Sequence, residues 1–307
     1  MKILLTGSGG MVGRNFLDHK FISNFTILTP LKSELDLRNF EMVKKYLEKQ
    51  KPELVIHAAG IVGGIEANLK DPVKFFLENL DIGRNLVWAS RESGVKKLIN
   101  LGSSCMYPIN LNAPLKEEFL LKGELEPSNE GYALAKIMTA RLCKYIKTED
   151  SNFQYKTIIP CNLFGPYDNF NSEYSHLIPA IIHKIHEAKK RLEKTVEIWG
   201  NGLARREFLY AGDFADGLMN AITKFNSLPD IINIGLGYDF TVQEYYEKVA
   251  EVVGFNGSFI YNLQKPVGVK QKLISIERQK KWGWCASDNL KFGIEKTYKY
   301  YLKQIAQ

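Results

Sequence analysis

The chain has 307 residues, of which 45% are apolar and 24% are charged, and its formal net charge is +7. This composition is typical of a globular protein and excludes a disordered or collagen-like chain. No apolar run approaches the ~20 residues that a bilayer-spanning helix needs, and the opening is too short for a signal-peptide core. The sequence therefore predicts a cytoplasmic protein without membrane contact, of about two domains or one doubly wound domain with an appendage.

The four cysteines, Cys105, Cys143, Cys161 and Cys285, lie far apart in the sequence, and the histidines do not cluster. This spacing argues against a disulfide framework and against a metal site, so we expect free thiols. The lysines are mostly dispersed at helix-surface spacing. Solvated helix faces account for the positive charge better than nucleic-acid binding, which stays open as an alternative.

The first elements predict a dinucleotide site. An apolar run at residues 2–6 leads into Gly7-Ser8-Gly9-Gly10-Met11-Val12-Gly13, and helical periodicity follows from Arg14. In a strand, turn and helix of this kind, glycines bring backbone N–H groups and the positive end of the helix against a pyrophosphate. We therefore expect the whole stretch 7–13 to bind the cofactor.

The second predicted strand, residues 25–29, indicates which cofactor is used. Dinucleotide folds that bind NAD usually place an acid after this strand, whereas here Pro30-Leu31-Lys32 follows. Lys32 can pair with a 2′-phosphate, so the sequence favours NADPH, although Glu34 keeps NADH open. Asp36 and Leu37, which lead into a helix ending at Gln50, are further cofactor candidates.

Strands and helices then alternate as far as residue 165. Strands are predicted at residues 54–60, 97–101 and 155–162, and helices at residues 71–93 and from Tyr132 to about Lys147. Ala58 and Ala59 are small enough for a cofactor to lie over them, and we expect His57 to be a packed residue. This alternation predicts an α/β fold with a Rossmann-type, doubly wound parallel sheet.

Beyond residue 165 the pattern becomes less regular. A helix is predicted at residues 178–190, a strand at 196–200, and shorter elements from residue 231 onward. We therefore predict a dinucleotide-binding domain at residues 1–165 plus about 205–230, and a smaller α/β substrate-binding lobe at residues 166–204 and 231–307.

The stretch Gly131-Tyr132-Ala133-Leu134-Ala135-Lys136 places a phenol and an ammonium on one helix face, at positions i and i+4. A nearby ammonium favours the phenolate, so this tyrosine can exchange a proton nearer to neutral pH. Proton delivery to oxygen is what carbonyl reduction by a hydride requires. Ser103, at the carboxyl end of the strand 97–101, faces the crevice in which ligands of parallel sheets bind.

Together the glycine turn, Ser103 and Tyr-x-x-x-Lys resemble the extended short-chain dehydrogenase/reductases. Four further stretches, at residues 102–108, 162–170, 175–180 and 206–209, are similar to the GDP-L-fucose synthase family. That resemblance implies epimerisation of a GDP-4-keto-6-deoxy sugar at C3 and C5, followed by NADPH-dependent reduction at C4. It also implies a homodimer.

The same resemblance assigns roles to individual residues. Ser103 would bind the C4 carbonyl, Tyr132 would donate its proton, and Lys136 would hold the nicotinamide ribose and lower the pKa of Tyr132. Cys105 and His176 would form the epimerisation pair. Further cofactor contacts would be Leu101, Gly102, Tyr132, Lys136, Pro160, Asn162, Leu163 and His176. Substrate contacts would be Ser103, Ser104, Cys105, Asn162, Lys184, Trp199, Arg206 and Lys272.

Several positions depart from the family pattern. Lys184 replaces an arginine, Val267 replaces an acid, and Gly9 and Pro30 replace arginines expected at the 2′-phosphate. Two alternatives therefore stay open. One is a C4 reductase of a related GDP-4-keto-6-deoxy sugar, such as a heptose, that has lost epimerisation. The other is a non-catalytic regulator that only binds a dinucleotide.

Overall fold

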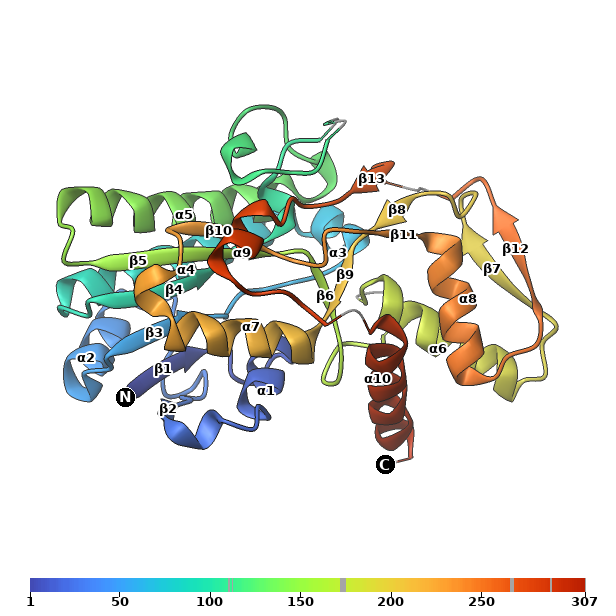
Figure 1. Ribbon diagram of the computed structural model, residues 1–307, viewed down its shortest axis with the longest axis horizontal. Helices are drawn as coiled ribbons and strands as arrows, with labels where there is room; N and C mark the ends of the chain where they lie inside the picture. Colours follow the sequence, from blue (N-terminus) through green and yellow to red (C-terminus); the bar gives the residue numbers. More distant parts are fainter. Residues whose placement is uncertain (110, 112, 172–174, 266–267, 288, 307) are drawn as a thin grey trace.

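The computed structural model describes residues 1–109, 111, 113–171, 175–265, 268–287 and 289–306. A parallel sheet lies between helices on its two faces, and a smaller lobe sits at one end of it (Figure 1). Across the described residues the strand order of this sheet is β10-β5-β4-β3-β1-β2. Its strands are β1 (Lys2–Thr6), β2 (Thr26–Leu28), β3 (Leu54–His57), β4 (Lys97–Leu101), β5 (Gln154–Pro160) and β10 (Ile231–Ile234).

The strands are apolar throughout because both faces of the sheet are covered. Ile3 and Ile56 belong to the core on the side of α1 and α7, whereas Leu4 and Val55 belong to the core on the side of α2 and α4. Successive side chains of a strand point to opposite faces, which accounts for this division. The flanking helices are α1 (Met11–Leu17), α2 (Phe40–Gln50), α4 (Pro72–Glu92), α5 (Glu130–Glu149) and α7 (Ala211–Thr223).

The smaller lobe has an apolar core of its own, built largely from isoleucine, valine and tyrosine side chains of its helices. These helices are α6 (Leu177–Lys190), α8 (Val242–Val253) and α10 (Leu290–Ile305). Beside them β7 (Thr195–Trp199) pairs with β12 (Ser258–Asn262), and β8 (Arg205–Arg206) lies between β11 (Phe240–Thr241) and β13 (Gln271–Lys272). A further pair, β6 (Asn162–Phe164) and β9 (Phe208–Tyr210), connects the lobe with the main sheet.

The predicted Rossmann-type doubly wound sheet with a smaller lobe is confirmed, but the division at residue 231 is wrong. Strand β10 pairs in parallel with β5 and so completes the main sheet. Ile274 and Trp282, which flank or end α9 (Glu277–Trp282), also pack in the core of this sheet. Their apolar side chains fill the end of the sheet that β5 alone would leave exposed. The sequence analysis also missed α3 (Ile65–Lys70).

Two smaller expectations are confirmed. His57 is buried, its Nδ1 lies 3.1 Å from Thr6 Oγ1, and burial lowers the pKa of its imidazole to about 3, so it is a packed neutral residue. All four cysteines are free thiols. Within the ranges given above, no helix has the length and apolarity needed to cross a bilayer.

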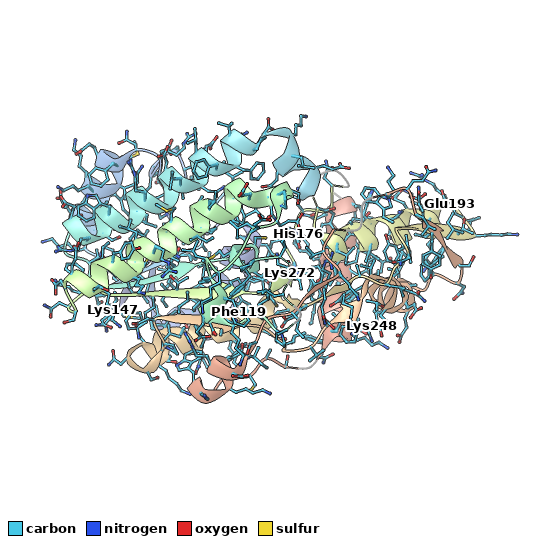
Figure 2. The ribbon with its side chains drawn as sticks, turned by 90° about the horizontal axis from the view of Figure 1, so that it is seen from above. Phe119, Lys147, His176, Glu193, Lys248 and Lys272 are labelled. Carbon is cyan, nitrogen blue, oxygen red and sulfur yellow. The ribbon has the colours of Figure 1, made fainter. Side chains whose placement is uncertain are left out.

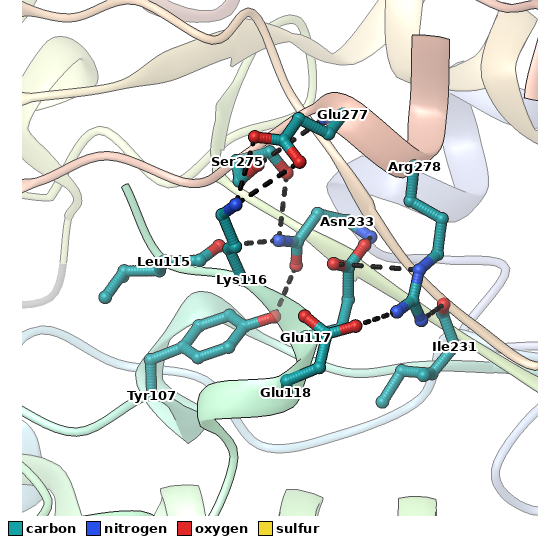
Figure 3. Close-up of polar contacts among 10 residues, drawn as sticks. All are labelled: Tyr107, Leu115, Lys116, Glu117, Glu118, Ile231, Asn233, Ser275, Glu277 and Arg278. Carbon is teal, nitrogen blue, oxygen red and sulfur yellow. Dashed lines mark hydrogen bonds and ion pairs between the residues drawn. The ribbon is translucent and has the colours of Figure 1, made fainter. Parts of the chain in front are cut away.

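A buried polar network fixes the loop that follows β4 (Figure 3). The side chain of Asn233 in β10 accepts a hydrogen bond from the Tyr107 hydroxyl at 2.6 Å. Its Nδ2 donates to the backbone carbonyls of Leu115 at 2.8 Å and Ser275 at 3.1 Å, and its backbone N–H donates to Glu117 Oε1 at 2.8 Å. The loop is thereby tied to the sheet and to the segment before α9.

Exchange of Asn233 for aspartate should destabilise the fold, because a carboxylate would then face two carbonyl oxygens and Glu117. Asn233→Asp should lower the free energy of unfolding by about 3 kcal/mol, measured by urea denaturation at neutral pH. Asn256→Asp, at an exposed position, is the matched control and should unfold like the parent. Equal stabilities of the two variants would contradict this account of the network.

Candidate active site

A cavity of about 930 Å³ lies where the main sheet meets the smaller lobe. Its walls include the carboxyl ends of β4 and β5 and, from the lobe, α6, β8 and β13. The labelled side chains of His176 and Lys272 lie at this boundary in Figure 2. Ligands of open parallel sheets bind at the same edge, because the strands end there and the connecting loops diverge.

The glycine turn between β1 and α1 forms one end of the site. Gly10 is the N-cap of α1, and its N–H donates to the carbonyl of Gly7 at 3.1 Å. Gly7 has a φ of +73°, and a Cβ there would lie 2.6 Å from the backbone of Ala58 and Ala59. Only glycine fits, so the turn stays open to a phosphate at the helix N-terminus. Met11 and Val12 line the cavity.

Lys136 lies on the floor of the cavity. Its side chain is buried, and Nζ donates to the carbonyl of Leu101 at 3.1 Å. Burial lowers the pKa of this ammonium to about 8. A Cβ on Gly60 would lie 3.5 Å from Nζ and 2.9 Å from Asn79 Oδ1, so the missing side chain leaves room beside the amine.

Tyr132 is half-buried next to Lys136, with Nζ 5.8 Å from the centre of the phenol ring. Burial has the largest effect on the pKa of Tyr132 in this structure. Burial raises the pKa of the phenol, the nearby Cys105 adds to this effect, and a hydrogen bond with Ser103 opposes it. The phenol therefore keeps its proton at neutral pH, as a proton donor must.

Cys105 lies in the 3-10 turn η2 (Ser104–Met106). Its backbone N–H donates a hydrogen bond to Ser103 Oγ at 3.2 Å. Two donors approach the sulfur, Asn129 Nδ2 at 3.3 Å and Lys272 Nζ at 3.6 Å. Sequence reasoning missed Asn129, because an asparagine directly before a helix indicates only a cap.

His176 is the N-cap residue of α6 and lines the same cavity. Burial lowers the pKa of its imidazole. A neutral imidazole has one N–H donor and one acceptor, so it can take or give a proton. Ser104, by contrast, is buried beneath the turn and is not among the residues that line the cavity.

The substrate candidates from the smaller lobe line the other end of the cavity. Lys184 donates from Nζ to the carbonyl of Glu197, and burial lowers its pKa. Trp199 is partly exposed, with Lys265 Nζ 4.9 Å from its ring centre. Arg206 donates from Nη1 to the carbonyl of Arg205 at 2.8 Å. An indole, a guanidinium and two ammonium groups thus gather where a nucleoside diphosphate would find stacking and charge.

The remaining predicted contacts fall into two groups. Among the cofactor candidates, Ala58, Leu101, Gly102, Pro160, Asn162 and Leu163 line the cavity. Lys32 and Asp36 instead lie beyond the end of β2, where Arg38 Nη2 bonds Asp36 Oδ2 at 2.7 Å and holds the pKa of that carboxyl at about 2. Leu37 is buried. Arg38, a second cation in this region, was not predicted. Val267 lies outside the described residues.

The comparisons with known proteins agree with this geometry. Residues 3–235 match the model of the NAD dependent epimerase/dehydratase family. The chain belongs to this family. A GDP-L-colitose synthase from Yersinia pseudotuberculosis is 51% identical over 99% of both chains, and a GDP-L-fucose synthase from Azorhizobium caulinodans is 47% identical over 98% of this chain and 96% of its own.

Solved structures extend this likeness. A GDP-6-OMe-4-keto-L-xylo-heptose reductase from C. jejuni superposes with a TM-score of 0.89 at 30% identity, covering 99% of this chain and 98% of its own. A GDP-L-fucose synthetase from Naegleria fowleri bound to NADP gives a TM-score of 0.88 at 26% identity, covering 100% and 95%. The resemblance to GDP-L-fucose synthases is thereby confirmed.

A substitution at Gly13 tests whether the glycine turn is closely packed. A Cβ at Gly13 would lie 2.4 Å from the carbonyl oxygen of Gly7 and 2.6 Å from Ser8 Cα, whereas a Cβ at Gly9 would meet nothing within 4 Å. Gly13→Ala should therefore lower the free energy of unfolding by about 3 kcal/mol and abolish dinucleotide binding.

Urea denaturation and calorimetric titration with NADPH would measure both effects. Gly9→Ala serves as the control for stability, and its free energy of unfolding should stay near that of the parent. A Gly13→Ala variant with parental stability and affinity would show that the turn is not tightly packed.

Proposed function

We propose that the protein is an NADPH-dependent oxidoreductase that reduces C4 of a GDP-4-keto-6-deoxy sugar. The observation that carries this proposal is one cavity in which Ser103, Tyr132 and Lys136 lie beside the glycine turn, with cationic and aromatic groups at the far end. The relatives named as GDP-L-fucose and GDP-L-colitose synthases support it. So does the heptose reductase from C. jejuni, which matches at 30% identity.

The residues fit NADPH. A Cβ at Gly7 or Gly13 would clash with backbone atoms, so glycine keeps the turn tight, whereas Gly60 leaves room beside Lys136. Lys32 and Arg38 supply positive charge beyond β2 for a 2′-phosphate. We assign the cofactor contacts predicted from the sequence to this site. When bound, NADPH supplies the hydride to C4 of the sugar.

The chain's own residues supply and position the proton in this reduction. Ser103 holds the C4 oxygen by a hydrogen bond, and Tyr132, protonated at neutral pH, delivers its proton to that oxygen. Lys136 is anchored on the carbonyl of Leu101, from where its amine can hold the ribose and stabilise the phenolate that remains. Lys136 is buried, and Ser103 and Tyr132 are half-buried, so these interactions are partly shielded from water and strengthened.

We also propose that the protein epimerises its substrate before reduction. A C4 ketone acidifies the protons on C3 and C5, so one group can remove a proton and another can return it. Cys105 and His176, which line the same cavity, are the candidate pair. The ammonium of Lys272 lies 3.6 Å from the Cys105 sulfur.

The exact sugar distinguishes two versions of this function. L-colitose lacks the 3-hydroxyl group that L-fucose carries, so a colitose-type substrate needs inversion only at C5. The similarity to a GDP-L-colitose synthase favours that version, whereas the likeness to GDP-L-fucose synthases favours inversion at both carbons. A 4-keto heptose is the alternative substrate, supported by the likeness to the C. jejuni heptose reductase.

Incubation with NADPH and each of these GDP-4-keto sugars, followed by NMR of the products, tests the proposal. Consumption of NADPH with at least one sugar, and an alcohol at C4 of the product, is the expected result. If none of the sugars consumes NADPH, the proposed reductase activity is wrong, and a regulator that only binds the dinucleotide becomes the better account.

Removal of the phenol oxygen tests the proton donor. Tyr132→Phe should lower kcat by about 10²- to 10⁴-fold, the usual contribution of a positioned acid, and should leave the affinity for NADPH near the parental value. Tyr261→Phe, at an exposed tyrosine of β12, is the control and should turn over normally. Parental activity of Tyr132→Phe would exclude this residue as the donor.

We further propose a cytoplasmic homodimer, formed through α4 and α5. These adjacent helices expose large apolar side chains on one surface, including Val73 at 67%, Met138 at 55% and Tyr145 at 58%. Such a patch is unusual on a monomer and matches a self-complementary interface. Free thiols are in keeping with a reducing compartment.

A charge within this surface should prevent association. Met138→Glu should weaken dimerisation at least roughly tenfold, measured by light scattering and sedimentation over a range of concentrations. Leu263→Glu, an equally drastic change at an exposed residue of the smaller lobe, should leave the dimer intact. A parental protein that is monomeric at all concentrations would contradict the proposal.

A further inference from the structure

Asn129 lies near both Tyr132, which is proposed to act in reduction, and Cys105, which is proposed to act in epimerisation. It is the N-cap residue of α5, three positions before Tyr132, and it also ends the 3-10 turn η4 (Pro127–Asn129). Its Nδ2 donates a hydrogen bond to the sulfur of Cys105 at 3.3 Å. Resting on the function proposed above, we infer that Asn129 is a positioning residue that orients the Cys105 sulfur and stabilises its negative charge for proton transfer.

The geometry of the helix start supports this role. Asn39 and Asn289, at the N-caps of α2 and α10, accept a hydrogen bond from their own helix, each at 3.0 Å. Asn129 makes no such bond. A side-chain cap contributes about 1 kcal/mol of stability. The Asn129 amide does not make this capping bond and instead donates to the thiol of Cys105.

The amide oxygen of Asn129 is also available to a ligand in the cavity. Asn129 lines the cavity, and its Oδ1 is buried without a hydrogen-bond partner among the described residues. A buried acceptor without a donor is costly. A sugar hydroxyl in the cavity can supply the missing donor, so one amide would hold the thiol with its N–H and the sugar with its oxygen.

The charged groups around the thiol come from several elements. Lys272 of β13 lies 3.6 Å from the sulfur, and Tyr132 of α5 is close enough that charge on the thiol raises the pKa of the phenol. Glu126, before η4, and His176, at the start of α6, line the same cavity. Lys272 supplies positive charge from the opposite lobe, whereas Asn129 supplies a neutral donor of fixed direction.

The proton transfer that this arrangement serves is balanced. As the C–H bond beside the ketone breaks, its proton forms the S–H bond, and its electron pair moves onto the C4 oxygen as an enolate. A proton from the second acid then restores the C–H bond on the opposite face. The N–H of Asn129 stabilises the sulfur while it is an anion, so its removal should leave less of the sulfur ionised at neutral pH and slow the exchange.

The test measures solvent deuterium incorporation at C3 and C5 as a function of pH, without NADPH. Asn129→Asp replaces the donor with a carboxylate, so exchange should fall at least tenfold at neutral pH. The acid limb of the profile should move up by about one pH unit. Affinity for NADPH and thermal stability should stay parental, and Asn289→Asp, the same exchange at an N-cap remote from the cavity, should behave like the parent.

Asn129→Ala is the second variant, which adds no charge and should show a shift in the same direction. An unshifted acid limb in either folded variant would overturn the inference, because a merely structural residue would change stability and leave the limb in place. A parental enzyme that reduces the ketone without exchange would also overturn it while leaving the reductase intact. A parental enzyme that consumes no NADPH would instead overturn the proposed function.

Discussion

The buried carboxylate of Glu207 links the two halves of the cavity through hydrogen bonds. Its Oε1 accepts hydrogen bonds from the backbone N–H groups of Leu236 at 2.7 Å and Gly237 at 2.9 Å, and its Oε2 accepts one from Ile274 at 2.9 Å. Glu207 itself lies between β8 and β9. It therefore joins the end of the main sheet, the lobe and the segment that leads to α9.

This arrangement is energetically demanding. Burial raises the pKa of Glu207 to about 7, and the three N–H donors oppose that rise. A buried carboxylate is tolerated where charge-assisted hydrogen bonds replace its hydration. Arg206, which precedes Glu207, lies opposite Lys272 in the pairing of β8 with β13. Arg206 and Lys272, which line the cavity, thus lie next to the buried carboxylate of Glu207.

Sequence reasoning predicted those parts of the site that depend on local spacing. The glycine turn, Ser103 and the Tyr132–Lys136 pair each lie within a few residues of one element, so periodicity locates them. Asn233 and Asn129 could not be found in this way. Asn233 acts through Leu115 and Tyr107, more than a hundred residues away, and Asn129 acts through a thiol in another loop. Such contacts exist only after the strands have been ordered in the sheet, and β10, which pairs with β5, was itself assigned to the smaller lobe.

The same division explains how proton transfer and reduction can vary independently. Ser103, Tyr132 and Lys136 all belong to the main sheet and to α5, so their mutual geometry does not depend on the smaller lobe. The sulfur of Cys105 does depend on it, because its two donors come from different halves, Asn129 from the start of α5 and Lys272 from β13. Lys272 is therefore the contact of the sulfur that depends on the position of the lobe. In the proposed reaction, epimerisation is therefore the step that depends on contacts from both halves, and reduction at C4 depends only on residues of the main sheet and α5.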